Sequence, residues 1–178
     1  MTKMLYKGFH KLVEEIGELV IELSSPAQSL FAMVDESVDV VAAIDYFIQT
    51  NDFVDNDKFK SISFMAEEST RLVMSSVNED AAVQNSLSTQ CLLLCGRSLQ
   101  TLGKIGGFPT TAEHPDGEMN LHDRVTAHLA GLRASCALFL ENNNRHANSS
   151  NVRYENKFKL FQEWDINGIL VPTEKEYQ

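Results

Sequence analysis

Residues 12–57 contain eleven Asp and Glu side chains and no Lys or Arg, although the stretch is otherwise strongly apolar. Burying a lone carboxylate costs free energy, and two buried carboxylates that lie close together repel each other. A fold built on this segment must therefore turn its acids toward solvent or receive a cation from outside to complete the site. The spacing of four of the acids favours the second arrangement, with a divalent metal ion as the cation.

The bulk composition indicates one soluble globular domain that spans residues 1–178. The formal net charge of −10 disfavours binding to nucleic acid or to an anionic membrane surface, because like charges repel. No stretch reaches the roughly 18 uninterrupted apolar residues that span a bilayer, and the N-terminus lacks the pattern of a signal peptide. Cys91, Cys95 and Cys136 lack the spacing of a zinc site, so we expect buried free thiols and a cytoplasmic location.

Helical periodicity dominates the chain and strand signals are poor, which predicts an all-α helical bundle. The first two helices carry the acids, additional helices follow within residues 58–141, and one helix closes the fold. The predicted helices span residues 4–24, 28–50, 58–77, 83–102, 121–141 and 152–164. We expect the main loops at residues 51–57, 103–120 and 142–151, and an irregular tail or one small strand at the C-terminus.

An internal similarity links two of these helices. Residues 36–52 align with residues 128–144 at many apolar positions, but Glu36 and Asp39 have no acidic counterpart in the second segment. Two degenerate helical half-bundles from a duplicated ancestor would explain the alignment, with the second half having lost its acids. Coincidence between two amphipathic helices explains it equally well.

Four acids have the spacing of a metal site. Glu15 and Glu18 are three residues apart, so they share a face at the margin of the apolar stripe of the first helix. Glu36 and Asp39 repeat this spacing on the second helix. Because the linker with Pro26 is short, the two helices should pack antiparallel and place the two acid pairs across one groove. Such a set of carboxylate oxygens suits Mg²⁺ or Mn²⁺.

Two other acids of the segment differ in their placement. Glu14 lies furthest from the apolar stripe of the first helix. Asp45 falls on the side of the second helix opposite Glu36. We therefore expect both carboxylates to be solvated and to take no part in the groove.

The acid pairs also resemble the signature of a known family. The chain has E-x-x-E, a gap of 17 residues and E-x-x-D, within the words KLVEEIGELVIEL and DESVDVVAAIDYF. This resembles the all-α nucleoside triphosphate pyrophosphohydrolases, the MazG-like and dimeric dUTPase-like group. The resemblance implies that Glu15, Glu18, Glu36 and Asp39 bind Mg²⁺ and form the catalytic centre. It also implies a (deoxy)nucleoside triphosphate substrate, cleaved between the α and β phosphates to monophosphate and pyrophosphate, with Glu15 or Glu18 as general base.

A later helix carries candidate substrate-binding residues. The family often has a helix rich in Asn, Lys and aromatic residues that contacts phosphates and base. In RYENKFKLFQEW, Arg153, Asn156 and Lys157 share one face, and the resemblance makes them the candidates. An ordinary amphipathic closing helix is the alternative. The stretch KFK at residues 58–60 is a second candidate for the substrate helix, because compact members of the family have far fewer residues in this region.

Two functions of different classes follow. The first is an Mg²⁺-dependent nucleotide pyrophosphohydrolase that controls or cleans a nucleotide pool, with dGTP and dATP or non-standard nucleotides as open choices of substrate. The second is a non-catalytic helical protein that acts in oligomerisation or regulation. The broad apolar stripes of the first two helices predict a homodimer or homotetramer in either case.

Overall fold

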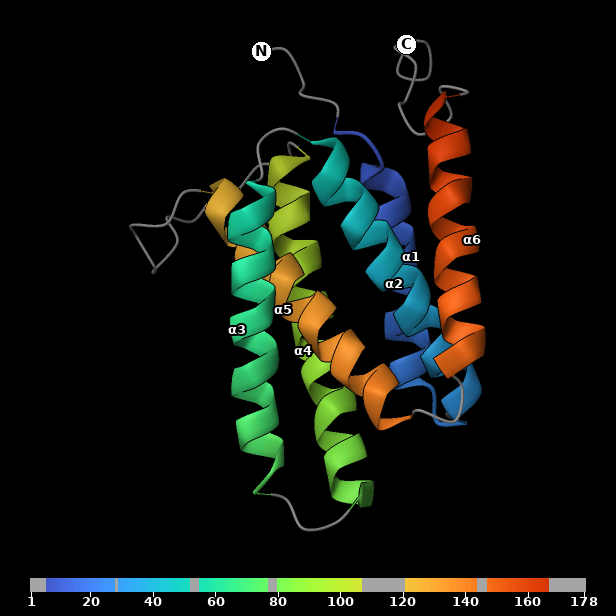
Figure 1. Ribbon diagram of the computed structural model, residues 1–178, viewed down its shortest axis with the longest axis vertical. Coiled ribbons are helices and arrows are strands. Elements are labelled where there is room, and N and C mark those ends of the chain that lie inside the picture. Colours follow the sequence, from blue (N-terminus) through green and yellow to red (C-terminus); the bar gives the residue numbers. More distant parts are fainter. Residues whose placement is uncertain are drawn as a thin grey trace.

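The computed structural model describes residues 6–27, 29–51, 55–76, 80–106, 121–143 and 147–166. Within these ranges the chain forms six α-helices and no strand, which confirms the predicted all-α bundle (Figure 1). The helices are α1 (Phe9–Ser24), α2 (Leu30–Thr50), α3 (Asn56–Met74), α4 (Asp80–Ile105), α5 (Leu121–Asn142) and α6 (Ala147–Ile166). Among them, none combines the length and the apolar character that crossing a membrane requires.

The main difference from the predicted helices is at the start of α6. This helix begins at Ala147, so the prediction of a loop over residues 142–151 is wrong for its last five residues. The segment before Arg153 is polar and shows no amphipathic pattern. Its helical state depends on the docking of α6 against α2, because tertiary packing supplies most helix stability in proteins. Most of the predicted loop at 103–120 and the predicted tail beyond α6 lie outside the described residues.

A side-chain cap sets the start of α3. The Asp55 carboxylate accepts hydrogen bonds from the backbone N–H groups of Asp57 and Lys58, at 2.9 and 3.0 Å. These N–H groups have no partner inside the helix, so an acidic N-cap stabilises this end. The helix therefore begins at Asn56, within the segment that the sequence predicts as a loop.

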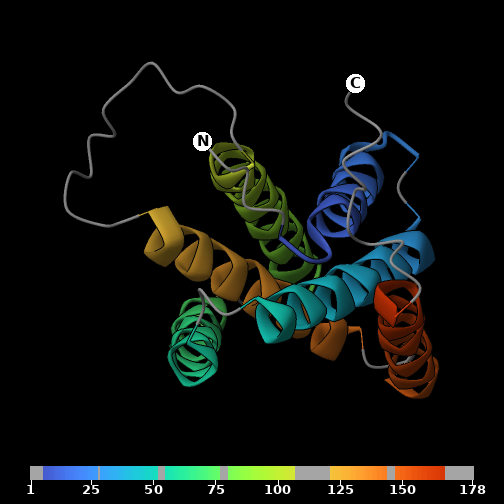
Figure 2. The ribbon, with the colours of Figure 1, turned by 90° about the horizontal axis from the view of Figure 1, so that it is seen from above.

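The helix pairings have a twofold character. Helix α1 packs on α2 and α4, α2 packs on α5 and α6, and α5 packs on α3 and α4. This set is unchanged when α1, α2 and α6 are exchanged for α4, α5 and α3. Figure 2 shows the two groups side by side, with α2 of one group and α5 of the other meeting in the middle. The two segments that align in the sequence lie on α2 and α5, which correspond to each other in this exchange.

Helix α2 lies at the centre of this arrangement. Its residues from Ser37 to Ile44 are buried without interruption, because α1, α5 and α6 cover it on different sides. The core around it draws large side chains from several helices, and among these are Leu12, Phe47, Leu102, Phe139 and Phe161. The three cysteines are free and buried in the same core, as predicted. Acidic residues on α2 are consequently carried into the protein interior.

One polar clasp aligns α1 with α2. The Asn51 side chain accepts a hydrogen bond from the backbone N–H of Lys7 and donates one to the Lys7 carbonyl, both at 3.0 Å. Gly8 follows with φ at +71°, and a Cβ atom there would lie 3.1 Å from the Tyr46 ring. The chain can enter α1 at this place only with a residue that tolerates the left-handed region beside an aromatic ring. The clasp thereby positions the acids of α1 against those of α2.

We expect Gly8→Ala to lower the free energy of unfolding by about 1–3 kcal/mol, because Ala is strained at this φ and crowds Tyr46. Chemical denaturation measures the change. Gly96→Ala is the matched control: Gly96 lies inside α4 with nothing within 4 Å of the added Cβ, so the variant should be at least as stable as the wild type. Equal stability of the Gly8→Ala variant and the wild type would contradict the need for glycine.

Candidate metal centre

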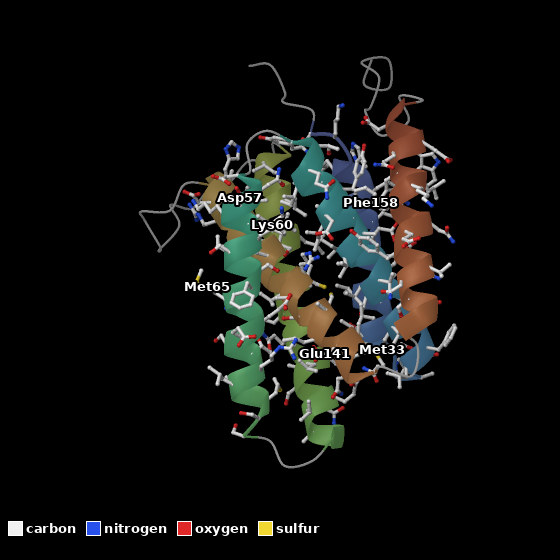
Figure 3. All side chains as sticks on the ribbon, in the orientation of Figure 1. Met33, Asp57, Lys60, Met65, Glu141 and Phe158 are labelled. Carbon is white, nitrogen blue, oxygen red and sulfur yellow. The ribbon has the colours of Figure 1, made fainter. Side chains whose placement is uncertain are left out.

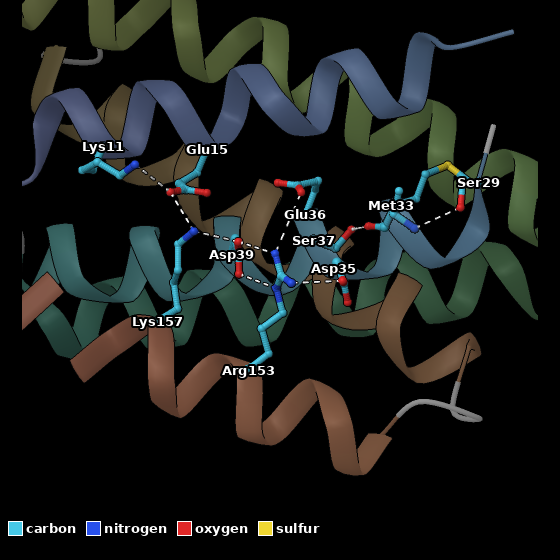
Figure 4. A network of polar contacts seen from close by, with 11 residues as sticks. Lys11, Glu15, Ser29, Met33, Asp35, Glu36, Ser37, Asp39, Arg153 and Lys157 are labelled. Carbon is cyan, nitrogen blue, oxygen red and sulfur yellow. Dashed lines mark hydrogen bonds and ion pairs between the residues drawn. The ribbon is translucent and has the colours of Figure 1, made fainter. Parts of the chain in front are cut away.

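The structure brings the predicted acids of α1 and α2 together. Glu15, Glu18 and Glu36 each offer a carboxylate oxygen, and these three oxygens lie within 4.8 Å of one another. Asp39 lies one helical turn beyond Glu36 and is joined to Glu15 through a lysine (Figure 4). The four acids of the two predicted pairs therefore lie close together, and they divide into a set of three glutamates, the glutamate trio, and a separate aspartate.

The acids differ in their burial. Glu15 is fully buried, with 0% of its surface exposed, because it adjoins the core residues Leu12, Ile16 and Leu19. Glu36 is half-buried and Glu18 is exposed. The trio thus spans from the core to solvent.

Burial changes the protonation of two of the glutamates. Removal from water raises the pKa of Glu15. The same cause, with repulsion from Asp39 and Glu18, raises the pKa of Glu36 from its ordinary 4.5 to about 7. These carboxylates are therefore poorly stabilised as anions by the chain alone.

Basic side chains of the same chain meet the acids, contrary to the expectation that the cation comes from outside. Arg153 donates from Nε to Asp39 Oδ1 at 2.8 Å and from Nη2 to Asp39 Oδ2 at 2.7 Å. Lys157 Nζ donates to Asp39 Oδ2 at 2.8 Å and lies 3.1 Å from Glu15 Oε1. Both cations come from α6, more than 110 residues along the chain, so no local pattern reveals them.

Two residues of the centre, Lys11 and Asp35, were not predicted from the sequence. Lys11 Nζ lies 3.2 Å from Glu15 Oε1 and 2.7 Å from Glu14. Asp35 accepts a hydrogen bond from Arg153 Nη1 at 3.0 Å. The i,i+4 spacing of Lys11 and Glu15 is a signal that could have identified the lysine.

The cations leave part of the trio unsatisfied. The Oε2 atoms of Glu15 and Glu36 are buried and have no hydrogen-bond partner among the described residues. Glu15 Oε1 lies at ion-pair distance from two lysines but is not aligned for a hydrogen bond with either. Unpartnered buried carboxylate oxygens that converge with a third carboxylate fit a hard divalent cation such as Mg²⁺ or Mn²⁺.

The candidate substrate residues have different surroundings. Arg153 and Lys157 lie against the acids, whereas Asn156 is exposed. The alternative residues Lys58 and Lys60 lie on α3, which packs on α5 across the bundle from α6 (Figures 1 and 3). The position of α6 next to the acids thus favours α6 over α3 as the helix that belongs to this centre.

The predicted solvation of Asp45 is wrong, while that of Glu14 is correct. The side chain of Asp45 is only 12% exposed and accepts hydrogen bonds from Arg133 Nε at 2.6 Å and from the Tyr154 hydroxyl at 3.0 Å. Helices α5 and α6 cover the side of α2 that the sequence analysis assigned to solvent. The Glu14 carboxylate is half exposed, as expected.

The metal-free protein should lose stability as the pH rises toward neutrality because of Glu36. Between pH 4.5 and about 7 the folded chain holds a proton on Glu36 that the unfolded chain has released. The stabilisation from this group is complete below pH 4.5 and is lost as the pH passes about 7. The variant Glu36→Gln should therefore gain stability relative to the wild type across this range in the presence of a chelator.

Urea unfolding at a series of pH values tests this expectation. Glu68→Gln, which changes an exposed acid on α3, is the control and should differ from the wild type by a constant amount. A pH-independent difference for Glu36→Gln as well would show that Glu36 does not change its protonation on folding.

Asp45 should be a stabilising residue. Asp45→Ala leaves the half-buried Arg133 without its bidentate partner, so we expect the free energy of unfolding to fall by about 1–3 kcal/mol. The control is Glu141→Ala, which removes the carboxylate from the exposed pair with Arg71 and should change stability by about 0–1 kcal/mol. Equal effects of the two variants in thermal or chemical denaturation would contradict the distinction.

Comparison of the chain with protein-family models, with curated proteins and with solved structures finds no match.

Proposed function

We propose that the protein is a Mg²⁺-dependent nucleoside triphosphate pyrophosphohydrolase of the MazG-like type that releases a monophosphate and pyrophosphate. The observation that carries the proposal is the glutamate trio, whose carboxylates converge within 4.8 Å and include buried oxygens without partners. A divalent ion at such a site supplies Lewis acidity toward a phosphoryl oxygen and lowers the pKa of a water nucleophile. Mn²⁺ can replace Mg²⁺ because both take oxygen ligands.

The residues of the chain then have distinct roles. Glu18 is the exposed member of the trio, so it can accept the proton of an attacking water and pass it to solvent. Glu15 is fully buried and better suited to hold a cation in place. Glu36 and Asp39 line the groove from α2. This arrangement favours Glu18 over Glu15 as the general base.

Helix α6 supplies the positive charge for a triphosphate. Arg153 and Lys157 lie at the acid groove and present a guanidinium and an ammonium group, the groups that recognise phosphate oxygens. Asn156 is one helical turn beyond Arg153 and exposed, so it is available to read a sugar or a base. A nucleotide would enter between α6 and the open end of the trio.

A homodimer or homotetramer is part of the proposal. Helix α3 carries Phe64, Met65, Leu72 and Val73, each more than half exposed. Figure 3 shows Met65 pointing away from the bundle. Exposed large apolar side chains along one helix are typical of a surface that another protein chain covers.

A non-catalytic role is the second candidate. The observation that favours it is that Arg153 and Lys157 neutralise Asp39 within the chain, as expected for a polar cluster that stabilises the fold. In that case the protein acts in oligomerisation or regulation and hydrolyses no nucleotide.

Product analysis decides between the two. A panel of NTPs and dNTPs with Mg²⁺ or Mn²⁺ should give monophosphate and pyrophosphate, and a chelator should abolish the reaction. In ¹⁸O-labelled water the label should appear in the monophosphate, because attack is expected at the α-phosphorus. Glu36→Gln should lower kcat by roughly 100-fold or more.

The control is Glu68→Gln, an acid on α3 away from the centre, which should keep the wild-type rate. Label in pyrophosphate alone would place the attack at the β-phosphorus. Full activity in excess chelator, or no hydrolysis of any nucleotide, would contradict the proposed function.

A further inference from the structure

We infer that the cluster of acids on α1 and α2 binds a single divalent ion, at Glu15, Glu18 and Glu36. At the adjoining Asp39, the side chains of Lys157 and Arg153 supply the positive charge that a second metal ion would otherwise supply. This inference rests on the proposed function and assigns the number of ions and their place.

The acids of the cluster fall into two sets that differ in their hydrogen-bond partners. The glutamate trio has buried oxygens without a partner, and Glu15, one of its members, is fully buried. Asp39 is equally buried, with 2% of its side chain exposed, but both of its oxygens accept hydrogen bonds. The trio is therefore open to a ligand, whereas Asp39 is already satisfied.

Lys157 occupies the position that a second metal ion would need. Its ammonium lies 2.8 Å from Asp39 Oδ2 on α2 and 3.1 Å from Glu15 Oε1 on α1, so it bridges carboxylates of two helices (Figure 4). A second ion that bridged the same two carboxylates would need this position. An ammonium group donates and cannot act as a metal ligand, so the two cations exclude each other there.

The charges of the cluster favour an added cation. Six carboxylates lie in contact with one another or with three cations of the chain. The acids are Glu14, Glu15, Glu18, Asp35, Glu36 and Asp39, and the cations are Lys11, Arg153 and Lys157. The acids outnumber the cations by three, so the cluster keeps a net negative charge that a bound divalent ion reduces.

Packing against aromatic residues holds the Lys157 side chain in this position. Lys157 Nζ lies 5.9 Å from the centre of the Phe161 ring, and Phe161 is itself buried in the core. Tyr154 and Phe158 stack on the same helix, and Phe158 packs on Tyr46 of α2. Withdrawal of Lys157 from Asp39 would require α6 to leave these contacts.

Counting bound Mn²⁺ tests the inference without an activity assay. The metal-free full-length protein is titrated with Mn²⁺, and free Mn²⁺ is measured by electron paramagnetic resonance. We expect one tightly bound ion per chain for the wild type. The variant Lys157→Met keeps an unbranched apolar stem against Phe161 and removes the charge, and combined with Arg153→Gln it should bind two ions.

Two further variants locate the second ion. Asp39→Asn in the double-variant background should reduce the count from two to one, because it removes the carboxylate that the double variant leaves without a cation. Lys159→Met changes an exposed lysine of the same helix and should keep the count at one. Circular dichroism of each variant establishes that the helices are retained, and if the double variant does not fold, Lys157→Met alone carries the test.

The outcomes separate the two proposals. No bound ion in the wild type would remove the metal centre itself and with it the proposed function. Two ions in the wild type would overturn the inference and leave the function intact. An unchanged count of one, or a loss of binding, in the folded Lys157 variants would also overturn the inference, since Lys157 would not then occupy a cation position.

Discussion

The contact between Asp39 and the two cations of α6 is the interaction on which the other features depend. Asp39 lies on the central helix, where α1, α5 and α6 exclude water from it. A charge in this environment requires a partner, and loss of one member of such a pair typically costs about 3–5 kcal/mol. Arg153 and Lys157 are the partners of Asp39, and because both lie on α6 their contacts also hold α6 against α2. The docking of α6 thereby neutralises Asp39 and leaves buried oxygens of Glu15 and Glu36 without a partner among the described residues.

The centre combines compensated and uncompensated charge. Asp39 and Asp35 are neutralised within the chain, whereas Glu36 retains a carboxylate whose pKa is raised to about 7 by burial and by neighbouring acids. A site that only stabilised the fold would gain from full compensation, because each unpaired buried oxygen reduces the free energy of folding. Unpaired oxygens beside a satisfied aspartate are therefore more consistent with binding a ligand than with a structural role, which supports the proposed function.

The two halves of the bundle carry different polar side chains at matching positions. In the second half, α4 buries Ser98 and Thr101 at the spacing that Glu15 and Glu18 have on α1. Thr101 Oγ1 lies 3.4 Å from Nδ1 of His128, the residue that aligns with Glu36. Neutral polar groups need no external cation, so these positions of the second half can be buried without one. If the halves descend from one unit, the acids were dispensable for folding, which agrees with a functional role for those that remain in the first half.

The sequence by itself determined the local features of this protein. Apolar residues at intervals of three and four define the helices, and the same intervals set Glu15 beside Glu18 and Glu36 beside Asp39. Only the tertiary structure decided which charges meet. Lys157 lies 118 residues from Asp39, and Arg133 lies 88 residues from Asp45, so these pairs depend on which helices pack together. Helical periodicity places a side chain on a face of its own helix, but the burial of that face and the charge opposite it are fixed by the neighbouring helices, whose choice involves the whole core.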